Sequence, residues 1–208
     1  MNLPKTQLIF ILDRSGSMAG LEGDTIGGFN SMLIKQQGLT SDALVTTVLF
    51  DDKYELLHDR VNIKDISPIT SDDYFVRGST ALLDAMGKTI STLRSKKGCE
   101  KVLFVIITDG MENSSKEYTQ KSLKDMVDDA KEKMGWEFIF LGANIDAVTT
   151  ARNYGISAGR AINYHPDSNG VKASYAAVCE AAVELRTKSR LSSSWKKQAE
   201  KNYISRKN

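Results

Sequence analysis

The chain has 208 residues, of which 41% are hydrophobic and 26% are charged. This length suffices for one domain with a well-buried core and is short for two. The longest apolar runs, residues 8–12 and 102–107, are far below the roughly 18 to 20 residues that a helix needs to span a bilayer, which excludes a transmembrane helix. Two cysteines make neither a disulfide framework nor a cysteine-based zinc site. Because no basic segment with a long apolar core opens the sequence, we expect a cytoplasmic protein.

The net charge of +2 is unevenly distributed. From Arg186 onward, eight Lys and Arg residues stand against one Glu, which gives this end a charge of +7. The rest of the chain is mildly acidic. We therefore expect a domain over residues 1–188 and a separable basic tail over residues 189–208.

The first half of the chain begins with a predicted strand at residues 8–12, because consecutive apolar residues are typical of strands buried on both faces of a parallel sheet. Ile26, Phe29 and Leu33 then share one face of a predicted helix. Residues 43–58 hold two β-rich runs around a short polar link, which predicts a hairpin and an antiparallel edge. A second amphipathic helix follows, with one face formed by Leu82, Ala85, Met86, Thr89 and Leu93.

The second half continues the alternation of strand and helix. Residues 102–107 predict another buried strand, and a helix follows whose apolar face holds Leu123, Met126, Val127, Ala130 and Met134. The remaining predicted elements are a strand at 138–141, a short helix at 146–154, a short strand at 160–164 and a helix at 171–186. This order predicts the α/β class: a doubly wound, mainly parallel sheet with one antiparallel edge strand and helices on both faces.

Polar residues follow two of the predicted strands and precede one helix. Asp13, Ser15 and Ser17 follow the first strand, Asp109 follows the strand at 102–107, and Thr80 opens the helix before that strand. Functional groups gather at the carboxyl ends of strands in such sheets, so these side chains have a reason to meet. They supply only carboxylate and hydroxyl oxygens, a ligand set that suits Mg²⁺ or Mn²⁺ and suits zinc poorly. Helix caps and turns are the simpler use of such residues, but three clusters together favour a metal site.

Three motifs carry a resemblance to a known family. Asp-Arg-Ser-Gly-Ser after an apolar strand, Gly-Ser-Thr-Ala-Leu-Leu-Asp-Ala before a helix and Ile-Ile-Thr-Asp-Gly after another strand resemble a von Willebrand factor A (VWA) domain with a metal-ion-dependent adhesion site (MIDAS). The resemblance implies that Asp13, Ser15 and Ser17 contact the metal. It further implies that Thr80 binds the metal directly or through water and that Asp109 binds it mostly through water.

The same resemblance implies a function in protein binding. Family members typically complete the ion's coordination with an acidic residue of a partner protein. The chain is more similar to stand-alone bacterial and phage-encoded members than to secreted ones. The resemblance therefore implies a metal-dependent protein-binding module, with one Mg²⁺ or Mn²⁺ as its cofactor.

Residues around this edge of the sheet are candidate contacts for the partner. Arg14 could face the partner or reach solvent, and Glu112 and Asn113 follow Asp109 closely enough to lie on the rim. A plain solvated loop is the alternative for Glu112 and Asn113. A Mg²⁺-dependent phosphoesterase is the enzymatic alternative, but no general base is evident, so we expect no enzyme.

The basic tail offers a function of another class. Trp195 and Tyr203 are interleaved with Lys196, Lys197, Lys201 and Arg206, a combination that could pair with phosphates and stack on bases of a nucleic acid. The alternative is a solvated helix end, which we favour.

Overall fold

The computed structural model describes residues 6–96, 98–99, 101–188 and 190–206. Within these ranges six strands form one sheet in the order β3-β2-β1-β4-β5-β6. The strands are β1 (Thr6–Asp13), β2 (Ala43–Phe50), β3 (Tyr54–Asn62), β4 (Lys101–Thr108), β5 (Glu137–Gly142) and β6 (Ala161–Asn163). All neighbours pair in parallel except β2 and β3, which are antiparallel. The predicted mainly parallel sheet with one antiparallel edge strand is thus confirmed.

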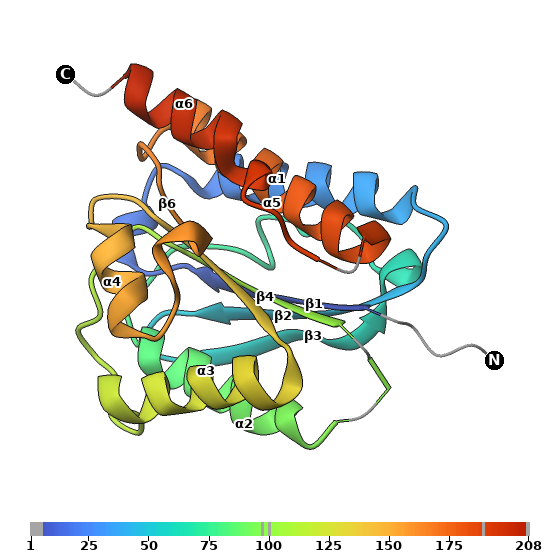
Figure 1. Cartoon of the computed structure of the whole chain (residues 1–208). Coiled ribbons are helices and arrows are strands. Elements are labelled where there is room, and N and C mark those ends of the chain that lie inside the picture. The colour runs from blue at the N-terminus through green and yellow to red at the C-terminus, as the bar shows by residue number, and fades with distance from the viewer. Residues whose placement is uncertain (1–5, 97, 100, 189, 207–208) are drawn as a thin grey trace.

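Helices cover both faces of this sheet (Figure 1). On one face lie α1 (Glu22–Gln37), α5 (Ser168–Lys188) and α6 (Lys197–Ser205). On the other lie α2 (Leu82–Arg94), α3 (Gln120–Met134) and α4 (Ala147–Asn153). Short 3-10 turns are η1 (Gly16–Met18), η2 (Ile63–Asp65), η3 (Ala158–Arg160) and η4 (Ser194–Lys196). The arrangement is the predicted doubly wound α/β fold.

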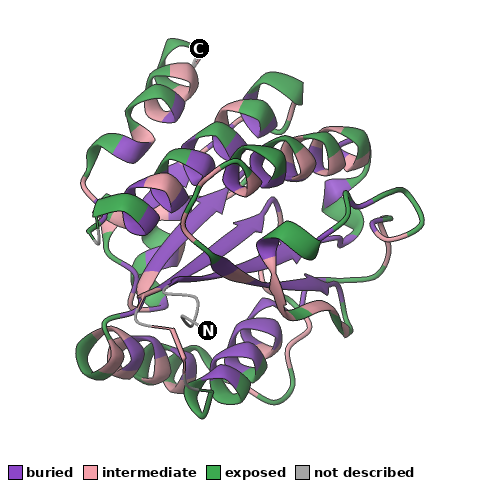
Figure 2. Ribbon diagram, turned by 90° about the vertical axis from the view of Figure 1, so that its right-hand side faces the viewer, coloured by how far each residue is buried: buried purple, intermediate pink, exposed green. Residues whose placement is uncertain are grey.

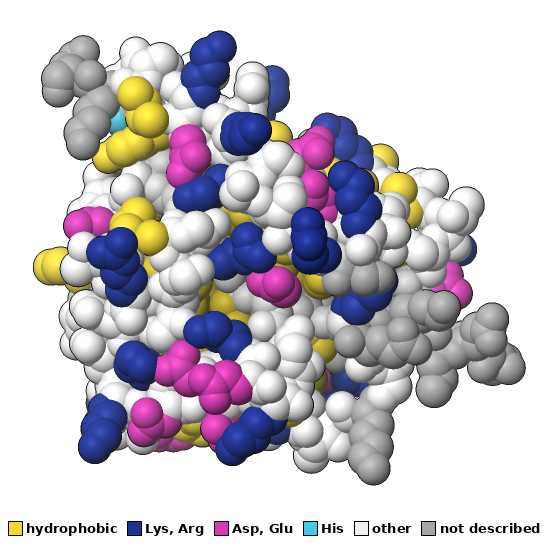
Figure 3. Space-filling view, viewed as in Figure 1, with side chains coloured by type: hydrophobic (Ala, Val, Ile, Leu, Met, Phe, Trp, Pro, Cys, Tyr) yellow, Lys and Arg dark blue, Asp and Glu magenta, His cyan; other side chains and the backbone are white. Residues whose placement is uncertain are grey.

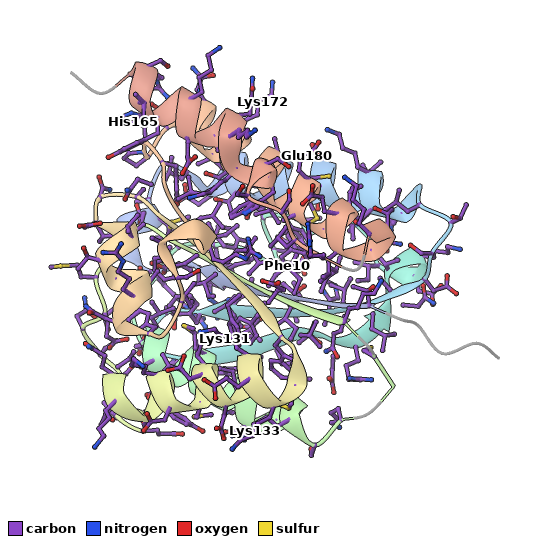
Figure 4. The ribbon with its side chains drawn as sticks, in the orientation of Figure 1. Phe10, Lys131, Lys133, His165, Lys172 and Glu180 are labelled. Atoms are coloured by element: carbon purple, nitrogen blue, oxygen red, sulfur yellow. The ribbon has the colours of Figure 1, made fainter. Side chains whose placement is uncertain are left out.

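Two hydrophobic cores lie between the sheet and its helix layers. Every residue of β1 is buried, because its side chains alternate between the two cores. Figure 2 shows the same burial on the central strands, with the exposed residues on the outer sides of the helices. Phe10 lies between the sheet and the helices α1 and α5 (Figure 4). Its ring packs edge-on against that of Phe29, with the two ring centroids 5.3 Å apart.

Local signals set the ends of the helices. α3 begins with a capping box, in which the Thr119 side chain accepts from the Ser122 main-chain nitrogen and Ser122 reciprocates. It ends at Gly135, whose φ of 66° is the left-handed conformation that glycine adopts freely. The loop from β4 therefore reaches α3 in a defined position.

The C-terminal segment is not separable from the domain, which corrects the predicted boundary between residues 188 and 189. Leu191, Trp195 and Ala199 are each 3% exposed and belong to the core that α1 and α5 cover. These residues recur every fourth position, so they share one face of the segment that includes α6. The basic segment is thereby held against α5 (Figure 1).

No helix in the described part of the chain is long and apolar enough to cross a membrane.

Candidate metal centre

The candidate site lies where β1 and β4 end side by side. Asp13 is the last residue of β1 and Asp109 directly follows β4. These strands are parallel neighbours, with Leu12 opposite Ile107. β1 leads to β2 on one side and β4 to β5 on the other, so this is the switch in strand order where such sheets bind their ligands.

Asp13 is held in a defined orientation. Its Oδ1 accepts from the Ser15 main-chain nitrogen at 2.7 Å, and its Oδ2 accepts from the Thr108 hydroxyl. Burial raises the pKa of Asp13 to about 6, although the hydrogen bonds from Thr108 and Ser15 lower it in part. The charge of Asp109 raises this pKa further. A cation at the site would favour the ionised form of both carboxyl groups.

Three hydroxyl groups from two distant segments gather beside Asp13. Ser15 and Ser17, on the loop after β1, have their Oγ atoms 3.1 Å apart. Thr80, just before α2, donates from its Oγ1 to the Ser15 Oγ at 2.9 Å. The structure thus brings together side chains that lie 65 positions apart in the sequence.

Asp109 is 2% exposed. Among the described residues, neither of its carboxylate oxygens accepts a hydrogen bond of normal geometry. Burial raises its pKa, and the neighbouring Ser17 hydroxyl offsets part of the rise. A carboxylate that is buried with so few donors is costly, and a cation at this position would offset that cost.

Gly110 completes the surroundings of the hydroxyl groups. A Cβ atom on Gly110 would lie 2.7 Å from the Ser17 Oγ and 3.1 Å from the Thr80 Oγ1. The glycine therefore leaves the space in front of the two hydroxyls free of a side chain.

This set of atoms fits a hard divalent cation. It consists of the carboxylates of Asp13 and Asp109 and the hydroxyls of Ser15, Ser17 and Thr80, all oxygen donors. In the part of the chain that the structure describes, no three His, Cys, Asp or Glu side chains gather as a metal-binding group. A cation here would thus rest on hydroxyls as much as on carboxylates.

Arg14 does not lie on the rim, contrary to the prediction. Its side chain is fully buried, with Nε 3.0 Å from the Asp51 Oδ2 and NH2 2.6 Å from the Glu55 Oε2. These two carboxylates offset the cost of burying the guanidinium. Arg14 is therefore not available for direct contact with a partner.

Glu112 and Asn113 hold the site together from the β4–α3 loop. The Glu112 Oε2 accepts from the Leu83 nitrogen in the first turn of α2 at 2.9 Å. The Asn113 Oδ1 accepts from the Thr80 nitrogen at 2.9 Å, and the Asn113 nitrogen donates to the Thr80 carbonyl. Glu112 is half-buried and Asn113 is exposed, so of these two residues Asn113 is the more open to a partner.

Asp51 is a site residue that the sequence argument missed. It lies in the short polar link of the predicted hairpin, and its Oδ2 accepts from both Arg14 and Arg77. Burial works to raise its pKa, but the hydrogen bonds from Arg77 and Lys53 and the charges of both arginines hold it below its usual value. The signal was present: Asp51 follows the parallel strand β2, whose carboxyl end lies beside that of β1.

Met111 was also missed, and no sequence signal distinguishes it. Its side chain is 75% exposed, next to Gly110, and Phe75 on the segment before α2 is 43% exposed. Large apolar side chains at such exposure around a candidate site are suited to contact with another protein.

The basic residues near the C-terminus divide into two groups. Lys196 donates to the carbonyls of Ala158 and Ala161 and pairs with Glu200, and Arg206 pairs with Asp167. Lys197 and Lys201 are exposed on α6. On the face in Figure 3, Lys and Arg side chains lie interspersed with Asp and Glu.

Comparisons with known proteins bear on the fold. No family model and no curated protein matches the sequence. Among solved structures, the pilus adhesin SpaC from Lactobacillus rhamnosus GG matches with a TM-score of 0.70 and 14% identity, over 89% of this chain and 31% of that chain. Proximal thread matrix protein 1 from the mussel byssus matches with a TM-score of 0.57 and 13% identity, over 88% of this chain and 46% of that chain.

Two further matches carry names that refer to the same kind of fold and site. The ArnB paralog VWA2 from Sulfolobus acidocaldarius has a TM-score of 0.56 at 15% identity, over 81% of this chain and 44% of that chain. The mussel protein has also been solved with a zinc-occupied MIDAS motif, matched with a TM-score of 0.54 at 14% identity over 86% of this chain and 46% of that chain. This chain thus spans less than half the length of these proteins, and the likeness concerns the fold.

Proposed function

Because the chain has the fold of the von Willebrand factor A domain, we propose that it is a non-enzymatic module that binds another protein through one Mg²⁺ or Mn²⁺. The ion would be held at the carboxyl edge of the sheet by Asp13, Ser15, Ser17, Thr80 and Asp109. An Asp or Glu of the partner would complete its coordination. The cytoplasmic location and the bacterial or phage type stay predictions.

The observation that carries this proposal is the Asp109 carboxylate. It is buried beside the hydroxyl cluster, and within the described residues neither of its oxygens accepts a hydrogen bond of normal geometry, although the Ser17 hydroxyl lies close by. A ligand at this position would offset the cost of burying the carboxylate, and the pair of carboxylates favours a cation. The all-oxygen donor set favours Mg²⁺ or Mn²⁺ over zinc.

The number of oxygen ligands explains why a partner carboxylate would bind. Two carboxylates and three hydroxyls leave a divalent ion with fewer than the six or more oxygens it prefers, so a position remains for an outside ligand. A bound ion would supply positive charge at that position. Met111 and Asn113 are exposed beside it and would contact the partner around its acidic residue.

Thermal unfolding in EDTA and in millimolar Mn²⁺ tests the metal site, with wild type and Asp109→Ala compared. At about 100 times the dissociation constant, the ion adds about 2.7 kcal/mol to wild-type stability, which raises Tm by several degrees. The variant should lose this rise, because a carboxylate that faces the site is gone. An equal rise in both proteins would contradict the assignment.

A random peptide library selected on the protein in Mn²⁺ tests the partner chemistry. We expect the recovered peptides to contain Asp or Glu and to be released by EDTA. Met111→Ser should weaken their binding without changing the Mn²⁺-dependent rise in Tm, because Met111 offers contact area and no ligand atom. Peptides that bind equally well in EDTA would contradict capture through the ion.

Nucleic-acid binding is not proposed. Lys196 and Arg206, two of the residues expected to contact phosphates, already have partners within the chain.

A further inference from the structure

Asp51 accepts hydrogen bonds from two arginines on one oxygen atom. The Arg14 Nε lies 3.0 Å and the Arg77 Nε 2.6 Å from its Oδ2. Asp51 and Arg14 are fully buried, whereas the Arg77 side chain is 38% exposed. Hydrogen bonds between charged groups are among the stronger ones in proteins, so Asp51 holds both arginines in fixed positions.

Each arginine belongs to a segment that carries candidate metal ligands. Arg14 lies between Asp13 and Ser15, and its carbonyl accepts from the Arg77 nitrogen at 2.8 Å. Arg77 begins the stretch that leads to Thr80. The two segments also meet where the Gly16 nitrogen donates to the Gly78 carbonyl at 3.1 Å.

Asp51 fixes the second segment through its main chain as well. Its carbonyl accepts from the Ala81 nitrogen at 2.8 Å, next to Thr80. Asp51 therefore hydrogen-bonds to both ends of the stretch from Arg77 to Ala81. Through Arg14 it is also connected to the loop that holds Ser15 and Ser17. These are the segments whose hydroxyls meet at the candidate site.

We propose that Asp51 and the two arginines, called here the Asp51 clamp, position Ser15, Ser17 and Thr80 for the metal ion. This inference rests on the proposed metal site and deepens it. Asp51 acts through the arginines and is a positioning residue, because its side-chain hydrogen bonds go to Arg14, Arg77 and the Lys53 nitrogen and none goes to a candidate ligand.

Arg77 is the residue through which the clamp can be tested without disturbing the core. Arg77→Met keeps an unbranched apolar stem of similar length and removes the donors to Asp51. Arg94→Met is the matched control, because Arg94 is also 38% exposed and pairs with Asp129 at 3.1 Å, between α2 and α3. Both variants lose a half-exposed arginine. Arg77→Met loses the ion pair to Asp51 and a longer one of 3.7 Å to Glu55, and Arg94→Met loses the pair to Asp129.

The electron paramagnetic resonance signal of free Mn²⁺ measures the affinity of each variant for the ion. In Arg77→Met this affinity should fall roughly tenfold, which is the smaller of the losses seen when a group that orients metal ligands is removed. Arg94→Met should bind as wild type does. Tm in EDTA should be similar in the two variants, which separates positioning from general stability. Removal of a positive charge alone would strengthen cation binding. Weaker Mn²⁺ binding in Arg77→Met would therefore not result from the change in charge.

Tighter or unchanged Mn²⁺ binding in Arg77→Met overturns the clamp while leaving the metal site in place. Failure of wild type to bind Mn²⁺ overturns the proposed function and the clamp together. Asp51→Asn is a second test, made at a temperature below the Tm of the variant. It should bind Mn²⁺ more weakly than Arg77→Met, because both arginines lose the carboxylate that they share and keep only Glu55 as a charged acceptor. Wild-type affinity in Asp51→Asn would also overturn the clamp.

Discussion

The Tyr74 hydroxyl donates a hydrogen bond to the main-chain carbonyl of Asp13, from a side chain that is 1% exposed. Tyr74 thereby ties the segment before α2 to the end of β1, below the candidate metal centre. Tyr175, on α5, is 2% exposed, yet its hydroxyl has no hydrogen-bond partner among the residues that the structure describes. The two tyrosines form a natural comparison.

Tyr74→Phe should lower the free energy of unfolding by about 1 kcal/mol or more, because it leaves a buried carbonyl without its donor. Tyr175→Phe should be neutral or stabilising, because it removes a buried polar atom that has no partner. Urea unfolding in EDTA measures both. Equal losses in the two variants would show that the Tyr74 hydrogen bond contributes nothing specific.

Gly110→Ala should abolish or strongly weaken Mn²⁺ binding. The added methyl group would lie 2.7 Å from the Ser17 Oγ and 3.1 Å from the Thr80 Oγ1, so the hydroxyls must move. The control is Gly159→Ala, where a Cβ meets nothing within 4 Å. Calorimetric titration with Mn²⁺ checks both variants, and normal affinity in Gly110→Ala would show that these hydroxyls do not face the ion.

Trp195→Ala should cost about 3 to 5 kcal/mol of stability, as for other large buried side chains. The residue lies beyond the expected domain boundary but is 3% exposed in the main core. Ile204→Ala, at a side chain that is 69% exposed, should change stability by no more than about 0.5 kcal/mol. Denaturant unfolding of both variants distinguishes a packed segment from a solvated one, for which both changes would be small.

The ion pair of Asp167 and Arg206 should give the docking of α6 a dependence on pH. The hydrogen bond from Arg206 lowers the pKa of Asp167 below its usual 3.8, so the pair stabilises the fold above pH 3.8. This contribution is lost as the pH falls through the lower pKa of the folded state. The Tm difference between wild type and Arg206→Gln should therefore be present at pH 7 and vanish in stronger acid, and it should shrink in high salt.

Most of the fold was predictable, because the patterns that encode it are local. Five consecutive apolar residues at 8–12 indicate a strand buried on both faces, whatever follows later in the chain. The meeting of Asp13 and Asp109 was predictable for a related reason: the carboxyl ends of neighbouring parallel strands share one edge of the sheet. The packing of the C-terminal segment against the core was not predicted. The prediction of a tail relied on the charge of this segment and not on the spacing of Leu191, Trp195 and Ala199.

The local sequence pattern does not predict the burial of Arg14. In sequence it stands between two candidate ligands, and its acceptor Asp51 lies 37 positions away. Whether an arginine faces solvent or the interior depends on whether the folded chain offers it a carboxylate, because an unpaired buried charge is too costly. Composition and periodicity thus determined the elements and the edge where the polar residues meet. The tertiary structure alone decided which charges pair at that edge, since such pairs join segments that only folding brings together.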